Sequence, residues 1–244
     1  MSSRQIRFAG QEVTGVAVAV CRMPQGHTHS GVLYRHTNGR LCLVHLRWDC
    51  DLAHEVFDGV NHRWDGGVAR DLFEGSYAWV IPDLLPEEMD DVRAVCRDLV
   101  RRMPTIHYSF LFDPEATLNP QTSEVVSAIA PYGLTCSTFV LAVFNSAQVQ
   151  MVHLTGWQSR PDDHRWYAAL LRYLGKTGVD PVHIARIQSN VQCLRVRPEE
   201  VAGACLASRD NIPAGYDHCE PAGRDVLRLL AGHADASLNR YSTN

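Results

Sequence analysis

The chain has 244 residues, of which 45% are hydrophobic and 20% are charged, the ordinary balance of a globular protein. Its formal net charge of -4 does not favour binding to nucleic acid or to an anionic membrane, and it disfavours strongly anionic substrates. This length suits one large domain. Within it we expect a core at residues 1–160 and a mainly helical extension at residues 161–244 that packs on the core.

The sequence lacks the signals that would send it into or across a membrane. No stretch approaches the roughly 18 consecutive apolar residues of a membrane helix, and the first residues lack the apolar region of a signal peptide. We therefore expect a cytoplasmic location, and export by a machinery that reads no N-terminal signal remains compatible with the sequence. The eight cysteines show no Cys-x-x-Cys spacing, so free thiols are expected rather than disulfides or a zinc ribbon. The sequence gives no indication of the oligomeric state.

The first eighty residues are typical of β structure, and helical patterns follow. Asn38-Gly39 separates two apolar runs and predicts a hairpin, because both residues tolerate positive φ. Strands are expected at residues 13–21, 30–35, 41–48, 77–81 and 191–196. Helices are expected at residues 86–103, 136–144, 162–174, 182–187, 198–207 and 224–231.

Cys136 stands at the start of the second predicted helix, directly after Thr135, a residue suited to cap it. The orphan N–H groups and the macrodipole at a helix N-terminus stabilise a thiolate by about 1 kcal/mol, and the N–H of Cys136 could hold a developing oxyanion. Most free cysteines are nonetheless small buried hydrophobes. Other residues must therefore decide whether this thiol is a nucleophile.

Three segments of the sequence indicate that Cys136 is a nucleophile, because together they resemble a known family. The segments His29-Ser-Gly-Val-Leu-Tyr, Leu43-Val-His45-Leu and Thr135-Cys-Ser-Thr-Phe-Val stand in that order along the chain. Together they resemble the circularly permuted papain-like cysteine hydrolases, which include permuted NlpC-type peptidases and the lecithin:retinol acyltransferase family. The resemblance covers roughly residues 12–145 and rests on the order of the three segments, since each segment alone consists of common residues.

The resemblance implies a fold and a set of roles. The fold would be α+β, a permuted papain-like core whose central antiparallel sheet packs against the nucleophile helix, with helices added at the C-terminus. Cys136 would be the nucleophile, His29 its base, and His45 the group that orients the base. Tyr108 lies in a segment similar to the tyrosine-containing segment that commonly precedes the cysteine, and it is a candidate substrate or oxyanion contact. Trp157, soon after the nucleophile helix, is a second candidate for lining the cleft.

Two alternatives for the histidines stay open. His27 would share a strand face with His29 and is its rival as the base, although only His29 matches the His-x-Gly-hydrophobic pattern. His27, His29 and His45 could also form a three-histidine metal site, for which no second shell or general base is evident. We expect no metal and no organic cofactor.

The expected activity is that of a cysteine peptidase or amidase that cleaves a peptidic amide or isopeptide bond through an acyl-enzyme thioester. An acyltransferase or esterase that uses the same site on a lipid or small acyl substrate is one alternative. A non-catalytic interaction module that retains the fold is the other. Retention of the cysteine together with both histidines favours the enzyme.

Overall fold

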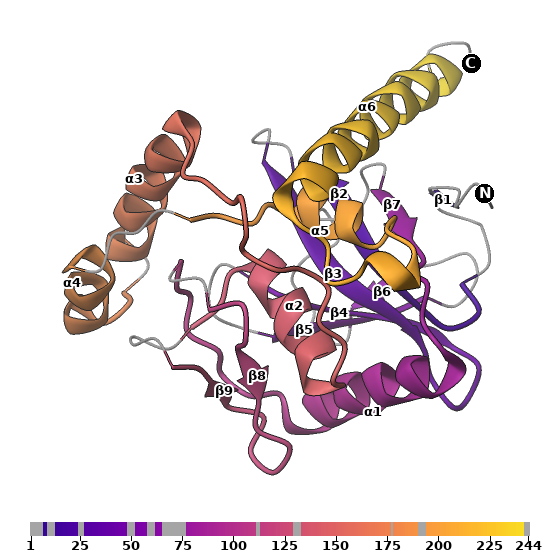
Figure 1. The fold of residues 1–244 in the computed structure, drawn as a ribbon, viewed down its shortest axis with the longest axis horizontal. Coiled ribbons are helices and arrows are strands. Elements are labelled where there is room, and N and C mark those ends of the chain that lie inside the picture. The colour runs from indigo at the N-terminus through magenta and orange to yellow at the C-terminus, as the bar shows by residue number, and fades with distance from the viewer. Residues whose placement is uncertain are drawn as a thin grey trace.

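The computed structural model in Figure 1 confirms a mixed α and β architecture. It describes residues 7–8, 13–23, 27–47, 52–57, 62–64, 77–110, 113–128, 133–176, 178–189 and 194–241.

One antiparallel sheet dominates the structure. Its strand order is β1-β7-β2-β3-β4-β5-β6, and each neighbouring pair runs antiparallel. The strands are β1 (Arg7–Phe8), β2 (Val16–Arg22), β3 (Thr28–Arg35), β4 (Leu41–Leu46), β5 (Leu52–Phe57), β6 (His62–Trp64) and β7 (Tyr77–Val80). A separate two-stranded ladder joins β8 (Thr117–Leu118) to β9 (Val125–Val126).

The predicted hairpin joins β3 to β4 through residues 36–40. The N–H of Gly39 donates to the His36 carbonyl at 2.9 Å, and the N–H of His36 donates to the Arg40 carbonyl at 2.8 Å. Of the hairpin residues only Gly39 has positive φ, at 81°. The connection is therefore a turn followed by a glycine bulge rather than a two-residue turn with two left-handed residues. Asn38 contributes through its side chain, which accepts from the Arg40 N–H at 3.0 Å.

Helices follow the sheet in the order that the sequence predicts. They are α1 (Pro86–Arg102), α2 (Cys136–Ser146), α3 (Pro161–Lys176), α4 (Pro181–Ser189), α5 (Pro198–Ala204) and α6 (Tyr216–Tyr241), with a short 3-10 turn at Arg209–Asn211. The strand expected at residues 191–196 is not found at residues 194–196, which carry no regular secondary structure, and residues 191–193 lie outside the described residues. The last helix, α6, is much longer than the stretch predicted at residues 224–231.

The early start of α6 was missed because Pro221 lies inside it and is typical of a helix boundary. Packing against α5 carries the helix through this position. A Cβ on Gly203 of α5 would stand 2.5 Å from the Cys219 carbonyl oxygen, and one on Gly223 of α6 would stand 2.9 Å from the Glu199 carbonyl oxygen. The two helices therefore cross at a distance that only glycine permits.

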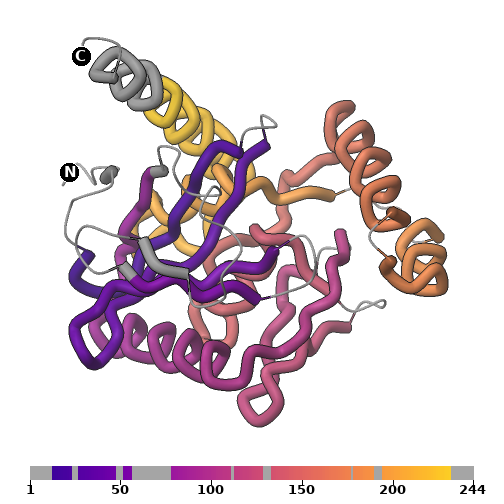
Figure 2. Tube along the Cα trace, turned by 180° about the vertical axis from the view of Figure 1, so that it is seen from behind, coloured from indigo at the N-terminus to yellow at the C-terminus, as the bar shows by residue number. Residues whose placement is uncertain are grey.

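The helices and the strands form two layers. Alternate β2 side chains point to opposite faces, with Val16, Val18 and Val20 in the large core shared with the helices. Ala17 and Ala19 belong to a smaller cluster that, among the described residues, is made of strand and strand-flanking side chains. Figure 1 shows α2 and α5 in front of the strands, and Figure 2 shows the strands nearest the viewer from behind. Helices α3 and α4 extend from one side of this body.

Within the residues that the structure describes, no helix is both long enough and apolar enough to cross a membrane.

Candidate active site

The candidate nucleophile opens helix α2, as predicted. Thr135 is the N-cap: its hydroxyl accepts from the Thr138 N–H at 3.2 Å, and its own N–H donates to the Thr138 hydroxyl at 2.7 Å. This reciprocal pair satisfies two of the backbone groups that a helix end leaves open. Cys136 is therefore the first residue of a well-defined helix, at the end where backbone N–H groups point outward.

The sheet opens beside this helix end, between β3 and β4. The β3–β4 ladder ends at the pair Val32 and Val44, whereas β3 stays paired with β2 as far as Thr28. The N–H of Arg35 donates to the Gly15 carbonyl, which flanks β2, at 3.0 Å. Because amide directions alternate along a strand, the N–H of Ser30 points away from β2 and into the opening.

The Cys136 sulfur meets Ser30 at this opening. The backbone N–H groups of Ser30 and Ser137 are directed at the sulfur and favour its thiolate form. Burial has the larger effect, since Cys136 is only 6% exposed, and it raises the pKa of the thiol above its usual value. The charge of Arg195 lowers the pKa in part. The resting residue is consequently a thiol with several groups arranged to receive its anion.

The structure brings the two predicted histidines together on the adjacent strands. His29 Nε2 lies 2.8 Å from His45 Nδ1, and the two rings meet edge to face with their centroids 4.9 Å apart. Gly31 makes this approach possible, because a Cβ at that position would stand 2.7 Å from the His45 Cβ. The glycine two residues after His29 thus accommodates the second histidine.

Glu55 on β5 extends this pair, and sequence reasoning missed it. Its Oε1 lies 3.1 Å from His45 Nε2, and both side chains are 1% exposed. Glu55 pairs with Leu43 in the β4–β5 register, which puts its side chain on the same face as that of His45. An acidic residue with its side chain in the protein interior would have indicated this role. Strand β5, which carries Glu55, was not among the predicted strands. We call the chain Glu55–His45–His29 the histidine relay.

The relay determines which nitrogen of His29 can act as a base. An ionised Glu55 accepts a hydrogen bond from the N–H at His45 Nε2, so a neutral His45 presents Nδ1 as an acceptor. His29 then donates from Nε2 and keeps the lone pair on Nδ1. Burial, and secondly the charge that His45 acquires on protonation, hold the pKa of His29 well below its usual value. His29 is therefore neutral at physiological pH.

The structure also bears on the two alternatives, His27 as the base and a metal site formed by three histidines. The carbonyl of His27 accepts from the Met23 N–H at 2.7 Å beside the β2–β3 connection, and the hydrogen bond to His45 is made by His29. A metal held by two imidazoles at about 2.0–2.1 Å from each would need the nitrogens farther apart than 2.8 Å. No group of three or more metal-ligating side chains is found within the described ranges.

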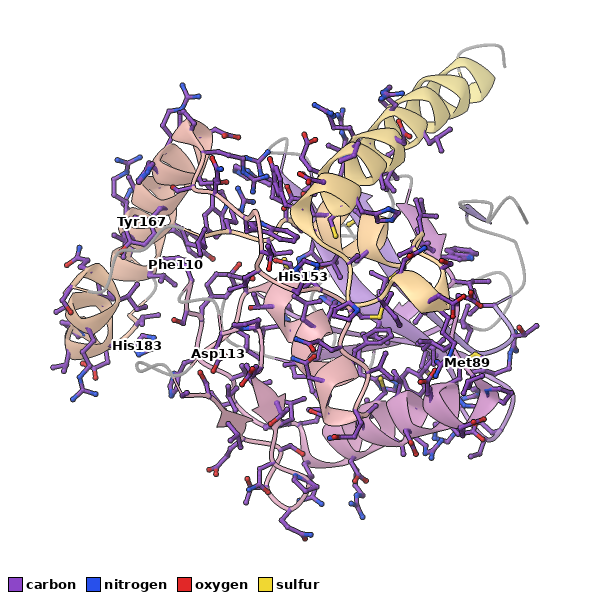
Figure 3. All side chains as sticks on the ribbon, in the orientation of Figure 1. Met89, Phe110, Asp113, His153, Tyr167 and His183 are labelled. Atoms are coloured by element: carbon purple, nitrogen blue, oxygen red, sulfur yellow. The ribbon has the colours of Figure 1, made fainter. Side chains whose placement is uncertain are left out.

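Tyr108 lies beside the segment that leads into the nucleophile helix. It is 2% exposed and forms an isolated parallel bridge with Leu134, two residues before Cys136. Its carbonyl accepts from His183 Nε2 of α4 at 3.1 Å if that nitrogen carries the proton. Figure 3 shows His183 on α4. The backbone of Tyr108 thus connects the body of the protein to α4.

Phe110 makes a second contact with the protruding helices. Its ring lies 4.6 Å from that of Tyr167 (Figure 3) and 5.6 Å from that of Trp166, measured between centroids, and both partners belong to α3. These aromatic contacts hold α3 against the segment that contains Tyr108.

The indole of Trp157 is buried, and it contacts the site through a hydrogen bond to a backbone carbonyl. Its Nε1 donates to the Arg195 carbonyl at 3.2 Å, and its ring packs on Tyr216 with the centroids 5.4 Å apart. The predicted cleft residue therefore positions the segment at residues 194–197.

Residues of the predicted C-terminal extension also reach the site. The Ser137 hydroxyl donates to the Val196 carbonyl at 2.7 Å, and the Thr28 hydroxyl donates to Glu199 Oε2 at 2.6 Å. These contacts connect the start of α2 and the start of β3 to the same short stretch. Sequence reasoning did not include this stretch in the site, because its contacts depend on tertiary packing that no local pattern encodes.

Comparisons of the chain with protein-family models, with curated proteins and with solved structures found no match.

Proposed function

We propose that the protein is a cysteine-dependent hydrolase of peptidic amide bonds, built on a permuted papain-like core. The observation that carries the proposal is the histidine relay, which ends at His29. The next residue, Ser30, directs its backbone N–H at the Cys136 sulfur. A structural cysteine does not need a buried carboxylate and two imidazoles hydrogen-bonded in series beside it. Buried titratable groups of this kind cluster at functional sites.

The proposed reaction begins with a neutral pair. His29 Nδ1 takes the thiol proton as Cys136 attacks the carbonyl carbon, and a carbon–sulfur bond forms. The N–H of Cys136 stands at the helix end where the oxyanion develops. The protonated His29 then gives its proton to the leaving nitrogen, and the carbon–nitrogen bond breaks to leave a thioester.

Water resolves the thioester in the second half. His29 takes a proton from the water as its oxygen attacks the carbonyl, and the carbon–sulfur bond then breaks to release the acid and restore the thiol. His45 and Glu55 stabilise the imidazolium that forms transiently in both halves and keep its ring in one orientation. The amide preference agrees with this scheme, because an amine leaving group requires a proton donor and the imidazolium supplies it.

The raised pKa of Cys136 and the lowered pKa of His29 favour proton transfer during attack over a preformed thiolate–imidazolium pair. Substrate binding changes this balance only if it changes the solvation of the two groups. The proposed enzyme therefore works by general-base catalysis, and its rate should follow the fraction of neutral His29.

The test is acylation by p-nitrophenyl acetate. We expect one acetyl group per chain, attached to Cys136 as a thioester that hydroxylamine removes, and no such adduct in the Cys136→Ala variant. Peptide amides are then assayed for cleavage with and without an acceptor amine. Acetylation spread over several residues, or unchanged in Cys136→Ala, would overturn the proposal. Products carrying the acceptor in place of water would identify the enzyme as a transferase that uses the same site.

A further inference from the structure

A second array of charged side chains surrounds the segment at residues 194–197, whose Val196 carbonyl accepts from Ser137 beside the thiol. Asp163 accepts from Arg160 Nε at 2.7 Å and from an Arg197 terminal nitrogen at 3.0 Å. Arg160 also binds Glu200, and Arg197 binds Asp162 at 2.7 Å. We call these residues the carboxylate–arginine array. Each of its two arginines is matched by two carboxylates at hydrogen-bonding distance.

Arg195 belongs to the same region, but its guanidinium is not matched by two carboxylates at hydrogen-bonding distance among the described residues. Within the described part of the chain, the one acid in ion-pair range of its guanidinium is Asp163, at 3.9 Å, which already accepts from two other arginines. The side chain is 16% exposed. Burial, and then the charge of Arg197, lower the pKa of Arg195, and the charges of Glu199 and Asp163 oppose this shift only in part. A largely buried guanidinium held at this distance from its counter-ion leaves hydrogen-bond donors for another acceptor.

The side chain is nevertheless held firmly in place. The Arg195 guanidinium carbon lies 3.8 Å from the centroid of the Trp166 ring, a stacking contact that fixes the plane of the fork. The Arg195 carbonyl accepts from Trp157 Nε1 and, at 2.8 Å, from Arg160. A stacked guanidinium with a fixed backbone is preorganised to bind a planar anion with two parallel hydrogen bonds.

This guanidinium lies on the nucleophile's side of the protein. The next residue, Val196, accepts the hydrogen bond from Ser137, which follows Cys136 directly. The charge of Arg195 is also felt at the Cys136 sulfur and at Tyr108. An anion bound to Arg195 would therefore lie close to an acyl group attached to the thiol.

We propose that Arg195 and Trp166 form a carboxylate subsite beside Cys136, so that the substrate carries one carboxylate close to its scissile carbonyl. This inference rests on the proposed function, since it names the substrate class of the same site. The carboxylate can come from an acidic side chain of the peptide or from its free C-terminus. The net charge of the chain disfavours polyanions, whereas a single carboxylate meets the local charge of Arg195.

The experiment compares acids with their amides as alkylating agents of the native protein. Iodoacetate and 3-iodopropionate are each paired with the corresponding amide, and adducts at Cys136 are quantified by peptide mass spectrometry. With a free thiol as reference, we expect one acid to gain about tenfold over its amide at Cys136, the size of a charge-assisted hydrogen bond. The Arg195→Gln variant should lose this gain, and Arg195→Lys should keep part of it.

Arg101→Gln is the matched control, because it removes the same charge from a side chain that is 67% exposed and paired with Asp98 on α1. It should keep the full preference for the acid. Rapid alkylation of Cys136 by the amides, without any gain for either acid, would overturn the subsite and leave the nucleophile intact. Slow alkylation of Cys136 by acids and amides alike would instead count against the proposed function.

Protection experiments on the unmodified chain cover the case in which Arg195→Gln does not fold. N-acetyl-aspartate amide and N-acetyl-glutamate amide present a side-chain carboxylate, and N-acetyl-alanine presents a C-terminal one. We expect one of these two groups to slow alkylation of Cys136 by iodoacetamide, with N-acetyl-asparagine amide as the neutral control. Equal protection by the neutral control, or no protection by any acid, would contradict a carboxylate subsite.

Discussion

Two hydrogen-bonded arrays connect to the residues around Cys136, one through Ser30 and the other through Val196, and they differ in construction. The histidine relay is linear: each member contacts the next, and a change at Glu55 alters which proton His29 carries. The carboxylate–arginine array is branched, since Arg160, Arg197 and Asp163 each bind two charged partners. A linear chain of this kind directs protons, and a branched one holds a backbone segment in place. Substitutions in the relay should therefore change chemistry, and substitutions around the array should change stability and specificity.

The largest effect is expected from His29→Ala. Loss of the general base should reduce the rate of acetylation by p-nitrophenyl acetate by about 10²–10⁴. His27→Ala is the matched control, because His27 is the rival base two residues away. An equal loss in both variants would contradict a specific role of His29 as the base. A loss only in His27→Ala would identify His27 as the base.

A smaller loss is expected from Glu55→Gln. The amide can donate to His45 Nε2 and so reverse the proton positions along the relay, which leaves His29 Nδ1 protonated. We expect the acetylation rate to fall by about 10²-fold or more, with most of the loss in the catalytic rate and little in substrate binding.

Nitrogen-15 chemical shifts of the His29 ring report this change of tautomer directly. Glu124→Gln, at an exposed carboxylate, serves as the control. Unchanged shifts together with an unchanged rate in Glu55→Gln would remove Glu55 from the relay.

Ser137→Ala tests the connection between the nucleophile helix and the C-terminal segment. It removes the 2.7 Å hydrogen bond to the Val196 carbonyl and leaves that buried acceptor without its partner. We expect the free energy of unfolding to fall by about 1–3 kcal/mol in urea denaturation. The pH dependence of acetylation should keep its shape, since the relay is untouched. A shifted pH profile without loss of stability would contradict the division between the two arrays.

The smallest effect is a dependence of stability on pH. Because the folded protein lowers the pKa of His29 below the unfolded value of about 6.5, the unfolded state binds the proton more readily. Stability is therefore retained above about pH 6.5 and falls as the pH drops toward the folded pKa, by at most about 1.4 kcal/mol per pH unit for one group. The His29→Gln variant should show a shallower slope in denaturation at pH 7 and pH 5. An identical slope would mean that His29 does not carry this titration.

The elements that the sequence predicts well are those set by local chemistry. Asn38-Gly39 indicated the hairpin, and Thr135 indicated the start of α2, because turn and cap preferences act over a few residues. The pairing of His29 with His45 followed from the hairpin register. Glu55 and Arg195 escaped notice because their roles depend on contacts across strands or across the whole chain. Arg195 in particular stacks on Trp166 and precedes Val196, whose carbonyl accepts from Ser137, and no spacing along the sequence connects these residues to Cys136.

The most direct test of the central claim is competitive alkylation of the native protein by limiting iodoacetamide near pH 6. At that pH an ordinary thiol is almost fully protonated, whereas a thiol with a neutral imidazole as base still reacts. We expect Cys136 to be modified first among the eight cysteines, and this advantage to disappear in His29→Ala but not in His27→Ala. Modification of Cys136 no faster than that of the other seven would contradict its assignment as the nucleophile.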